Sequence, residues 1–213
     1  MVDIFDPAYD KKVEIKVSDN KVNKGDDINL TAKDPTMNNI VVGVGWTLNA
    51  FDADTLDLDI CCFLLNKDGK TRVDEDFVFY NNVEACDGAV CHNGDNLTGA
   101  GDGDDETISI DLSGVPFDIV KIMFVFSIYK GEEKGQGMGS VRNGYLRVVN
   151  ASNSQEILRY DVQEEVEGHS ETAMLIASIN REGPKWHFEA VGEFVEGGLG
   201  KVATDYDIIV HQG

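Results

Sequence analysis

The sequence predicts a mainly β protein, a β-sandwich of two antiparallel sheets with short peripheral helices. Most apolar segments are short, they are rich in Val, Ile and Phe, and turn-forming residues separate them at roughly even spacing. This pattern is typical of sandwiches and barrels, in which each strand turns an apolar face towards a shared core.

The expected strands follow one another along the chain and cover residues 40–46, 60–65, 77–80, 107–112, 119–129, 144–150, 156–162, 171–181 and 186–194. The segment 171–181 has a helix-like composition, but its apolar residues alternate and a Gly-Pro turn follows, so we interpret it as a strand. Turn signals are the Asp-Gly pairs at 68–69 and 87–88, Ser-Asn-Ser at 152–154 and Glu-Gly-Pro at 182–184. The clearest helix lies near the C-terminus, at residues 199–207, where the apolar residues share one face.

We expect one domain over residues 13–213, preceded by an extension of residues 1–12. A chain of 213 residues suits a single domain with a substantial core. The first residues lack a basic segment followed by an apolar run, which argues against a secretory signal. No stretch approaches about eighteen consecutive apolar residues, so we expect a cytoplasmic protein without direct membrane insertion.

The balance of charge is strongly acidic. There are 39 Asp and Glu against 18 Lys and Arg, a formal net charge of −21. Such a surface repels phosphate backbones, which argues against a nucleic-acid-binding protein. Cations and basic partners fit this charge better.

The four cysteines are Cys61, Cys62, Cys86 and Cys91. Without a secretory signal, a disulfide framework is not expected. Cys61 and Cys62 are adjacent in an apolar strand, so we expect reduced thiols on opposite faces. Cys86, Cys91 and His92 do not predict zinc, because their spacing matches no tight ligand pair and a fourth ligand is missing.

The acidic residues concentrate between Val73 and Val120, where twelve Asp and Glu occur without any Lys or Arg. Within this run lies the segment GDNLTGAGDGDDE (94–106), with four glycines and five carboxylates. Crowded carboxylates repel one another unless a cation joins them. Glycines permit the sharp turns that fold oxygen ligands around one centre, and calcium takes about six to eight of them. The segment therefore predicts a calcium site.

Two further groups of oxygen ligands lie at expected strand ends. Asp57 and Asp59 flank Leu58, and the period of two along a strand puts both carboxylates on one face, about 7 Å apart. Asn81 and Asn82 follow the strand 77–80 and offer neutral amide oxygens. We expect these groups to converge with the acidic segment on one or two ions.

Other loop types are excluded by their required residues. An EF-hand needs acidic residues, a glycine and a final glutamate at fixed positions between two helices, and no register here supplies them. A P-loop needs Gly-Lys-Ser/Thr, which is absent, and the five carboxylates would repel a phosphate. A dinucleotide-binding GxGxxG turn is absent as well.

Ten segments carry a resemblance to a known family, in order and spacing: GVGW, DLDICCFLLNKDGK, DEDFVFYNN, DGAV, GDNLTGAGDGDDETISIDL, VPFDIVKIMFV, GSVRNGYLRVVN, EILRYD, ETAML and WHFEAVGEFVEGGL. From about Val13 to Tyr206 the chain resembles the TerD family. The resemblance implies a calcium-binding β-sandwich with two neighbouring ions, associated with resistance to tellurite, phage, colicins and other stresses. The ligands that it implies are Asp57, Asp59, Asn81, Asn82, Asp95, Asn96, Asp102, Asp104, Asp105, Glu106 and Glu171.

This chain departs from the family pattern outside the acidic segment. Residues 1–12 are additional, Thr47 follows the GVGW tryptophan where many members have Asp, and Cys61 and Cys62 replace small residues. The loop 128–133 lacks the usual His. These departures leave open which partner the protein serves.

The leading hypothesis is a calcium-binding, non-enzymatic stress protein that acts through protein partners in a stress-response complex, with any membrane association made through such a partner. One alternative is a metal-dependent hydrolase that uses Asp57 and Asp59 as an acid/base pair, with His92 nearby. The sequence shows no supported Ser-His-Asp or Cys-His set for it. Another alternative is a cyclic-nucleotide or small-ligand binding protein, for which the sequence offers no basic pocket.

Overall fold

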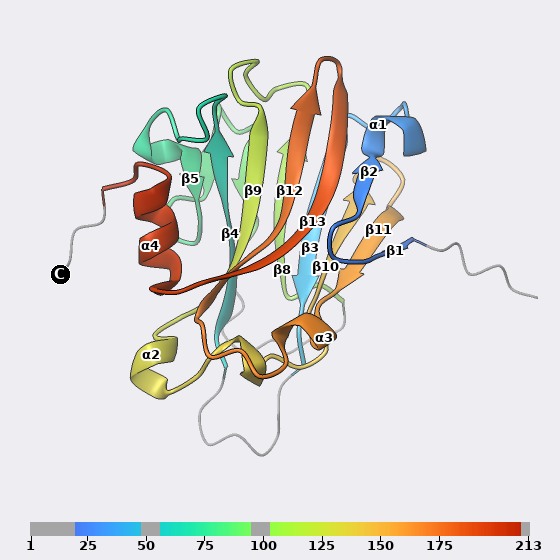
Figure 1. Ribbon diagram of the computed structural model, residues 1–213. Helices are drawn as coiled ribbons and strands as arrows, with labels where there is room; N and C mark the ends of the chain where they lie inside the picture. The colour runs from blue at the N-terminus through green and yellow to red at the C-terminus, as the bar shows by residue number, and fades with distance from the viewer. Residues whose placement is uncertain (1–19, 48–55, 95–102, 210–213) are drawn as a thin grey trace, which may run out of the picture.

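The computed structural model describes residues 20–47, 56–94 and 103–209. Within these ranges, a seven-stranded sheet and a six-stranded sheet face one another as a sandwich, with short helices at its ends and along one side (Figure 1). The predicted fold class is confirmed.

The seven-stranded sheet of the described residues, in spatial order, consists of β1 (Lys21–Val22), β11 (Gln155–Asp161), β10 (Tyr145–Asn150), β3 (Asn39–Gly45), β8 (Glu106–Asp111), β7 (Val90–His92) and β6 (Glu84–Ala85). Its neighbouring strands are antiparallel except at one edge, where β1 runs parallel to β11. The parallel pairing at that edge spans two residues, and the rest of the sheet is antiparallel as expected.

The six-stranded sheet of the described residues consists of β2 (Asp27–Asn29), β13 (Lys185–Val195), β12 (Ala173–Glu182), β9 (Lys121–Ile128), β4 (Leu58–Leu65) and β5 (Phe77–Val78), all paired antiparallel. The described helices are α1 (Leu30–Lys33), α2 (Gly131–Lys134), α3 (Gln163–Val166) and α4 (Gly198–Asp205), with 3₁₀ turns η2 (Asp74–Asp76) and η3 (Met138–Ser140).

Each strand expected from the sequence is present, and the ambiguous segment 171–181 forms β12. The helix expected at 199–207 is α4. The strand expected at 77–80 is shorter than predicted, because Phe79 and Asn82 exchange backbone hydrogen bonds and turn the chain after Val78. Patterns of two to four residues carry no periodic signal, which is why β1, β2, β6, β7 and α1 to α3 were not predicted.

Three of the four predicted turns join adjacent antiparallel strands. Cys86 and Asp87 adopt positive φ before Gly88 in the turn between β6 and β7. Ser154 and Gly183 also adopt positive φ, between β10 and β11 and between β12 and β13. The turn at 68–69 forms through the Asn66 side chain, but η2 intervenes before β5.

β4 is buried on both faces along its whole length. Ile60, Cys62 and Leu64 belong to the core between the sheets, whereas Cys61 and Phe63 point to the outer face of the six-stranded sheet. A strand covered on both sides reads as a continuous apolar run, as this one does. The prediction that the adjacent cysteines point to opposite faces is confirmed.

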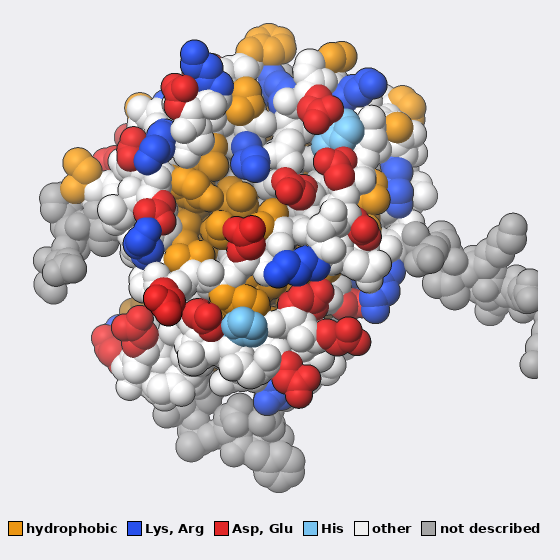
Figure 2. All heavy atoms as spheres, viewed as in Figure 1, with side chains coloured by type: hydrophobic (Ala, Val, Ile, Leu, Met, Phe, Trp, Pro, Cys, Tyr) orange, Lys and Arg blue, Asp and Glu red, His pale blue; other side chains and the backbone are white. Residues whose placement is uncertain are grey.

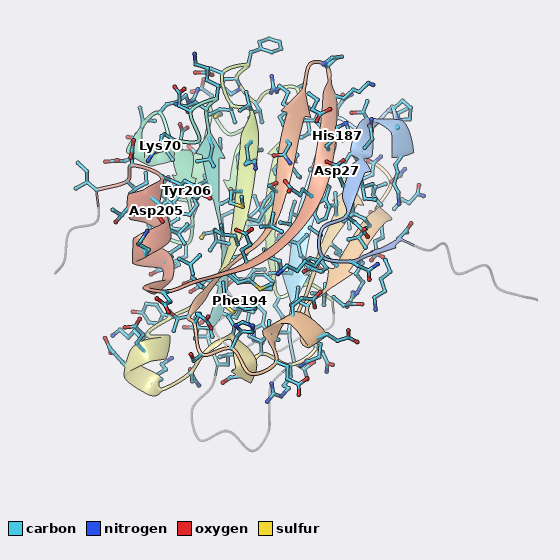
Figure 3. All side chains as sticks on the ribbon, viewed as in Figure 1. Asp27, Lys70, His187, Phe194, Asp205 and Tyr206 are labelled. Carbon is cyan, nitrogen blue, oxygen red and sulfur yellow. The ribbon has the colours of Figure 1, made fainter. Side chains whose placement is uncertain are left out.

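The outer face beside β4 is covered by α4, which packs Val202 and Ala203 on it. Hydrogen bonds join the C-terminal end of α4 to the loop after β4 (Figure 3). The Lys70 ammonium donates to the Asp205 carbonyl oxygen at 2.6 Å and to Asp207 Oδ1 at 2.8 Å. Thr71 donates from its backbone N and its hydroxyl to the carbonyl oxygen of Tyr206.

The face drawn in Figure 2 shows apolar side chains over the middle of the six-stranded sheet and acidic side chains gathered near α2. No helix within the described residues is long and apolar enough to cross a bilayer.

Burial separates the thiols into two classes. All four cysteines are free, Cys61 and Cys62 are buried, and Cys86 and Cys91 are half-buried. Burial raises the pKa of the Cys61 thiol well above its usual range, with further contributions from Cys62, Asp59 and Glu106. We therefore expect Cys61 and Cys62 to resist a thiol reagent in the native state and to react after denaturation without reductant. Mass spectrometry of the labelled peptides measures this; native labelling of Cys61 as fast as Cys91 would contradict it.

Candidate metal site at the acidic end of the sandwich

Several strands meet at one end of the sandwich, where β4 and β8 begin and β9 ends. Leu58 at the start of β4 pairs with Ile128 at the end of β9, and α2 follows directly. Five carboxylates lie at this end, which we call the acidic end: Asp57, Asp59, Glu106, Glu132 and Glu133.

Asp57 and Asp59 are buried, with 8% and 7% of their surface exposed. They flank Leu58, whose side chain lies in the core between the sheets. Alternation along the strand therefore directs both carboxylates towards the outer face of the six-stranded sheet, as the sequence predicted. Burying a carboxylate is costly unless donors or a cation stabilise its charge.

Asp59 lines a pocket of about 350 Å³ on this outer face. The Ser127 and Thr172 hydroxyls lie on its wall, and Glu132 and Glu133 of α2 lie at its edge. The sequence reasoning missed these two glutamates. The signal was their position directly after β9, the strand that pairs with Asp59.

Glu106 points the other way, into the space between the sheets, and is 2% exposed. Its Oε2 accepts a hydrogen bond of 2.9 Å from the backbone N of Ile60 on β4. His92 Nε2 lies 3.2 Å from the Ile60 carbonyl oxygen and 3.6 Å from Glu106 Oε2. β5 ends at Val78, opposite Cys62, so Glu106 and His92 take the place of a strand partner for Ile60.

The hydrogen bonds of His92 fix its tautomer. Its Nδ1 accepts from the backbone N of Gly94 at 3.3 Å, so this nitrogen carries no proton. Nε2 then holds the proton and donates to the Ile60 carbonyl oxygen. The imidazole is buried and both nitrogens contact the backbone, so His92 is not positioned as a general base.

Asp104 lies on the outer face of the seven-stranded sheet, away from Glu106. Its Oδ1 accepts from Arg147 Nε at 2.7 Å and from the Tyr145 hydroxyl at 3.0 Å, and its Oδ2 accepts from Arg147 Nη2 at 3.1 Å. The carboxylate rests against Gly43, where a Cβ atom would overlap it. Tyr145 also donates to the carbonyl oxygen of Gly103 at 2.9 Å, so this contact holds residues 103–104 on the sheet.

Asp105 is engaged differently from its neighbours. Its Oδ2 accepts from the backbone N of Trp46 at 2.9 Å. Burial raises the pKa of the Asp105 carboxyl, the Trp46 N–H lowers it, and the charge of Asp104 raises it further. The net shift is upward, which is the direction expected for crowded carboxylates without a cation.

The remaining described candidates lie around the acidic end without joining one cluster. Asn82 donates from its amide to the carbonyl oxygens of Phe77 and Glu75, and Asn81 is exposed in the same turn. Glu171 contacts His169 Nδ1 at 3.1 Å. A backbone hydrogen bond, a larger influence than His169, lowers the pKa of this glutamate.

Asp95, Asn96 and Asp102 fall outside the described residues. Among the residues that the structure describes, no three His, Cys, Asp or Glu side chains come close enough to hold a metal ion. The expected convergence on one or two ions therefore stays a prediction.

Part of the acidic run receives positive charge from outside it. Arg72 binds Asp76 through Nε and Nη2 and Asp118 through Nη1, as Arg147 binds Asp104. The expectation that the carboxylates of this run lack a counter-charge therefore does not hold for Asp76, Asp104 and Asp118.

Comparison with known proteins gives a family match over most of the chain. The model of the TerD domain matches residues 19–206. The chain is 43% identical to tellurium resistance protein TerD of Serratia marcescens over 88% of this chain and 96% of the relative. It is also 43% identical to general stress protein 16U of Bacillus subtilis, with the same coverage of both chains.

The fold is also similar to that of a solved structure. The crystal structure of a homologue of telluride resistance protein (TerD) from Streptomyces coelicolor A3(2) superposes with a TM-score of 0.64 at 18% identity. The match covers 78% of this chain and 95% of that chain. At this identity the likeness concerns the fold.

The contact between Asp104 and Gly43 gives a test of how residues 103–104 are held. Gly43→Ala would displace the Asp104 carboxylate from Arg147, so we expect it to lower the free energy of unfolding by about 1–3 kcal/mol, and we expect the same of Asp104→Asn. Gly200→Ala is the matched control, because nothing lies within 4 Å of its added Cβ. In α4 it is expected to stabilise by about 0.5–1 kcal/mol. Urea unfolding measures both, and an unchanged Gly43→Ala protein would contradict the assigned contact.

Proposed function

The chain belongs to the TerD family, and on that premise we propose that it is a calcium-binding stress protein of the tellurium-resistance type that acts by binding partners and not by catalysis. The named relatives include both tellurium resistance and general stress proteins. The resemblance found in the sequence implies calcium.

The observation that carries the proposal is the burial of three carboxylates at one end of the sandwich. Asp57, Asp59 and Glu106 are each less than a tenth exposed. Asp57 and Asp59 lie at the start of β4, and Glu106 begins β8, where the acidic segment 94–106 joins the seven-stranded sheet. Glu106 accepts a hydrogen bond from the backbone N of Ile60, and Asp59 is the residue before Ile60. Two of the three carboxylates therefore lie next to the same stretch of backbone. A divalent cation offsets the repulsion that such an arrangement builds up.

The pocket beside Asp59 offers oxygen ligands of the kind that a hard cation prefers. They are the Asp59 carboxylate, the Ser127 and Thr172 hydroxyls and the two glutamates of α2. Lys130, directly before α2, also lines the pocket. We propose that Asp57 and Asp59 contribute to one ion and that Asp95, Asn96 and Asp102, which lie outside the described residues, supply further ligands. Calcium accepts carboxylates, carbonyls and hydroxyl oxygens at irregular angles, which suits ligands from loops.

The environments of the described histidines support a binding role over an enzymatic one. His92 is buried with both nitrogens in backbone contacts. His187 contacts Asp27 at 2.8 Å, and Figure 3 shows the pair at the β13–β2 edge. His169 stacks on Phe194 at 3.6 Å between ring centres and contacts Glu171. A Ser-His or Cys-His mechanism needs an imidazole hydrogen-bonded to the nucleophile, and the hydrogen bonds among the described residues include no serine or cysteine side chain bound to an imidazole.

Calcium is expected to stabilise the folded state, by about 4 kcal/mol at a thousandfold excess over its dissociation constant. Asp59→Asn is expected to reduce the rise in melting temperature. Asp87→Asn is the matched control: it makes the same charge change within the acidic run, at an exposed position whose positive φ Asn also tolerates. Scanning calorimetry with chelator and with millimolar calcium measures the shift, and equal shifts in both variants would reject the role of Asp59.

Calcium is expected to bind more tightly than magnesium, and its binding is expected to weaken between pH 7 and pH 5. Magnesium demands near-octahedral geometry and keeps its waters, whereas protons compete with either ion for carboxylate oxygens.

Calcium binding weakens as pH falls. In the metal-free protein the contribution of Asp105 to the free energy of unfolding changes with pH in the opposite direction. The raised pKa of Asp105 means that the folded state holds this proton more tightly than the unfolded state. The favourable contribution of Asp105 is then fully present below its unfolded pKa of about 3.9 and is lost as pH rises through the folded value. Isothermal titration with both ions at both pH values, and urea unfolding in chelator, test this. Equal affinity for calcium and magnesium would mean that the site is an acidic surface without preference for calcium, and would contradict the prediction.

A further inference from the structure

A second pocket lies at the opposite end of the sandwich from the acidic end. Figure 1 shows α1 and the turn between β12 and β13 at this end, and α2 and α3 at the other. The loop after α1, the loop between β8 and β9 and the β12–β13 turn enclose a pocket of about 350 Å³.

The pocket combines an apolar floor with an exposed aromatic rim. Met37, Leu112 and Trp186 form the floor and are each less than a tenth exposed. At the rim stands Phe117, whose surface is 90% exposed. Exposing a whole phenylalanine side chain forgoes about 1.5–3 kcal/mol of burial, and aromatic residues beside arginine are enriched at protein interfaces.

One cation lies between these aromatic rings. The Arg181 guanidinium carbon is 4.4 Å from the centre of the Trp186 ring and 5.1 Å from that of Phe117. Its Nη2 donates to the Val115 carbonyl oxygen at 2.7 Å. Within the described part of the chain, Arg181 forms no ion pair with a carboxylate, and its buried Nε has no acceptor. Nearby Asp118 is bound by Arg72 instead.

Desolvation makes this arrangement unfavourable in the isolated protein. Burial lowers the pKa of Arg181, and the charge of Asp118 opposes this only in part. Arginine stays protonated in proteins, so the guanidinium remains charged beside an apolar pocket. A carboxylate brought to its exposed edge would form a charge-assisted hydrogen bond with it.

We propose that this pocket binds a peptide segment of a partner protein in which a carboxylate lies next to an apolar side chain. The carboxylate binds the Arg181 guanidinium, and the apolar side chain packs on Met37, Leu112 and Trp186. The binding mode is independent of calcium at the acidic end.

The exposure of Phe117 is the reason for a peptide and not a small acid. A ligand confined to the pocket would leave most of the Phe117 ring in water. A peptide that continues over the rim covers the ring and gains its burial. The pairing of charge with apolar surface follows from the same contacts, since the Arg181 guanidinium lies over both aromatic rings, so a carboxylate bound to it is next to apolar surface.

The probe is a pentapeptide of glycine and serine that ends in phenylalanine with a free carboxylate, titrated into the full-length protein in chelator and in calcium. We expect shifts of the Arg181 Nε and Trp186 indole signals in ¹H–¹⁵N spectra, and at least about tenfold weaker binding for the amidated peptide. Arg181→Met is expected to weaken binding of the free-acid peptide to the level of the amidated peptide. Phe117→Ala is expected to weaken binding of both peptides. Arg142→Met, an exposed arginine at the other end, is the control for lost charge.

Any of four results would overturn the proposal. Three are equal affinity for the free-acid and amidated peptides, unchanged affinity in Arg181→Met, and binding of N-acetylphenylalanine as tight as that of the pentapeptide, which would identify a site for a small free carboxylate. The fourth is the absence of any response of either reporter at millimolar peptide, which would reject the pocket as a binding site.

Discussion

The geometry of the acidic end depends on which groups form hydrogen bonds with the backbone N–H and carbonyl oxygen of Ile60. β5 is too short to pair with this residue, and an unsatisfied buried N–H or carbonyl costs about 1–3 kcal/mol. Glu106 accepts from its N–H and His92 donates to its carbonyl oxygen, both from the opposite sheet. These two side chains tie the sheets together next to Asp59, and so they fix where its carboxylate lies.

The same end distributes its negative charge over three separate places. Glu106 lies between the sheets, Asp59 on the outer face of one sheet and Asp104 on the outer face of the other. Asp104 and Glu106 are close in sequence, and their positions on opposite faces of the seven-stranded sheet weaken the repulsion between them. Arg147 then neutralises Asp104 from outside the acidic run.

The sequence predicted those features that depend on local alternation. The continuous apolar run of β4, the alternating residues of β12 and the shared face of Asp57 and Asp59 are properties of one strand, and each can be read from its own residues. The short β5, the ion pair of Arg147 with Asp104 and the pocket that Asp59 shares with Glu132 depend on partners far apart in the chain. No pattern within a segment specifies which distant arginine meets a given carboxylate, so these contacts could not be predicted. The convergence of Asn81 and Asn82 with the acidic segment is still a prediction.

The two ends of the sandwich thus have opposite chemistry, with carboxylates at one and a guanidinium among aromatic rings at the other. We propose that calcium binds at the acidic end beside Asp57 and Asp59. Anomalous diffraction at long wavelength from crystals grown in calcium tests this directly. We expect an anomalous peak within bonding distance, about 2.3–2.6 Å, of the Asp57 or Asp59 oxygens. Ordered calcium elsewhere in the molecule with no peak at these two carboxylates would contradict it.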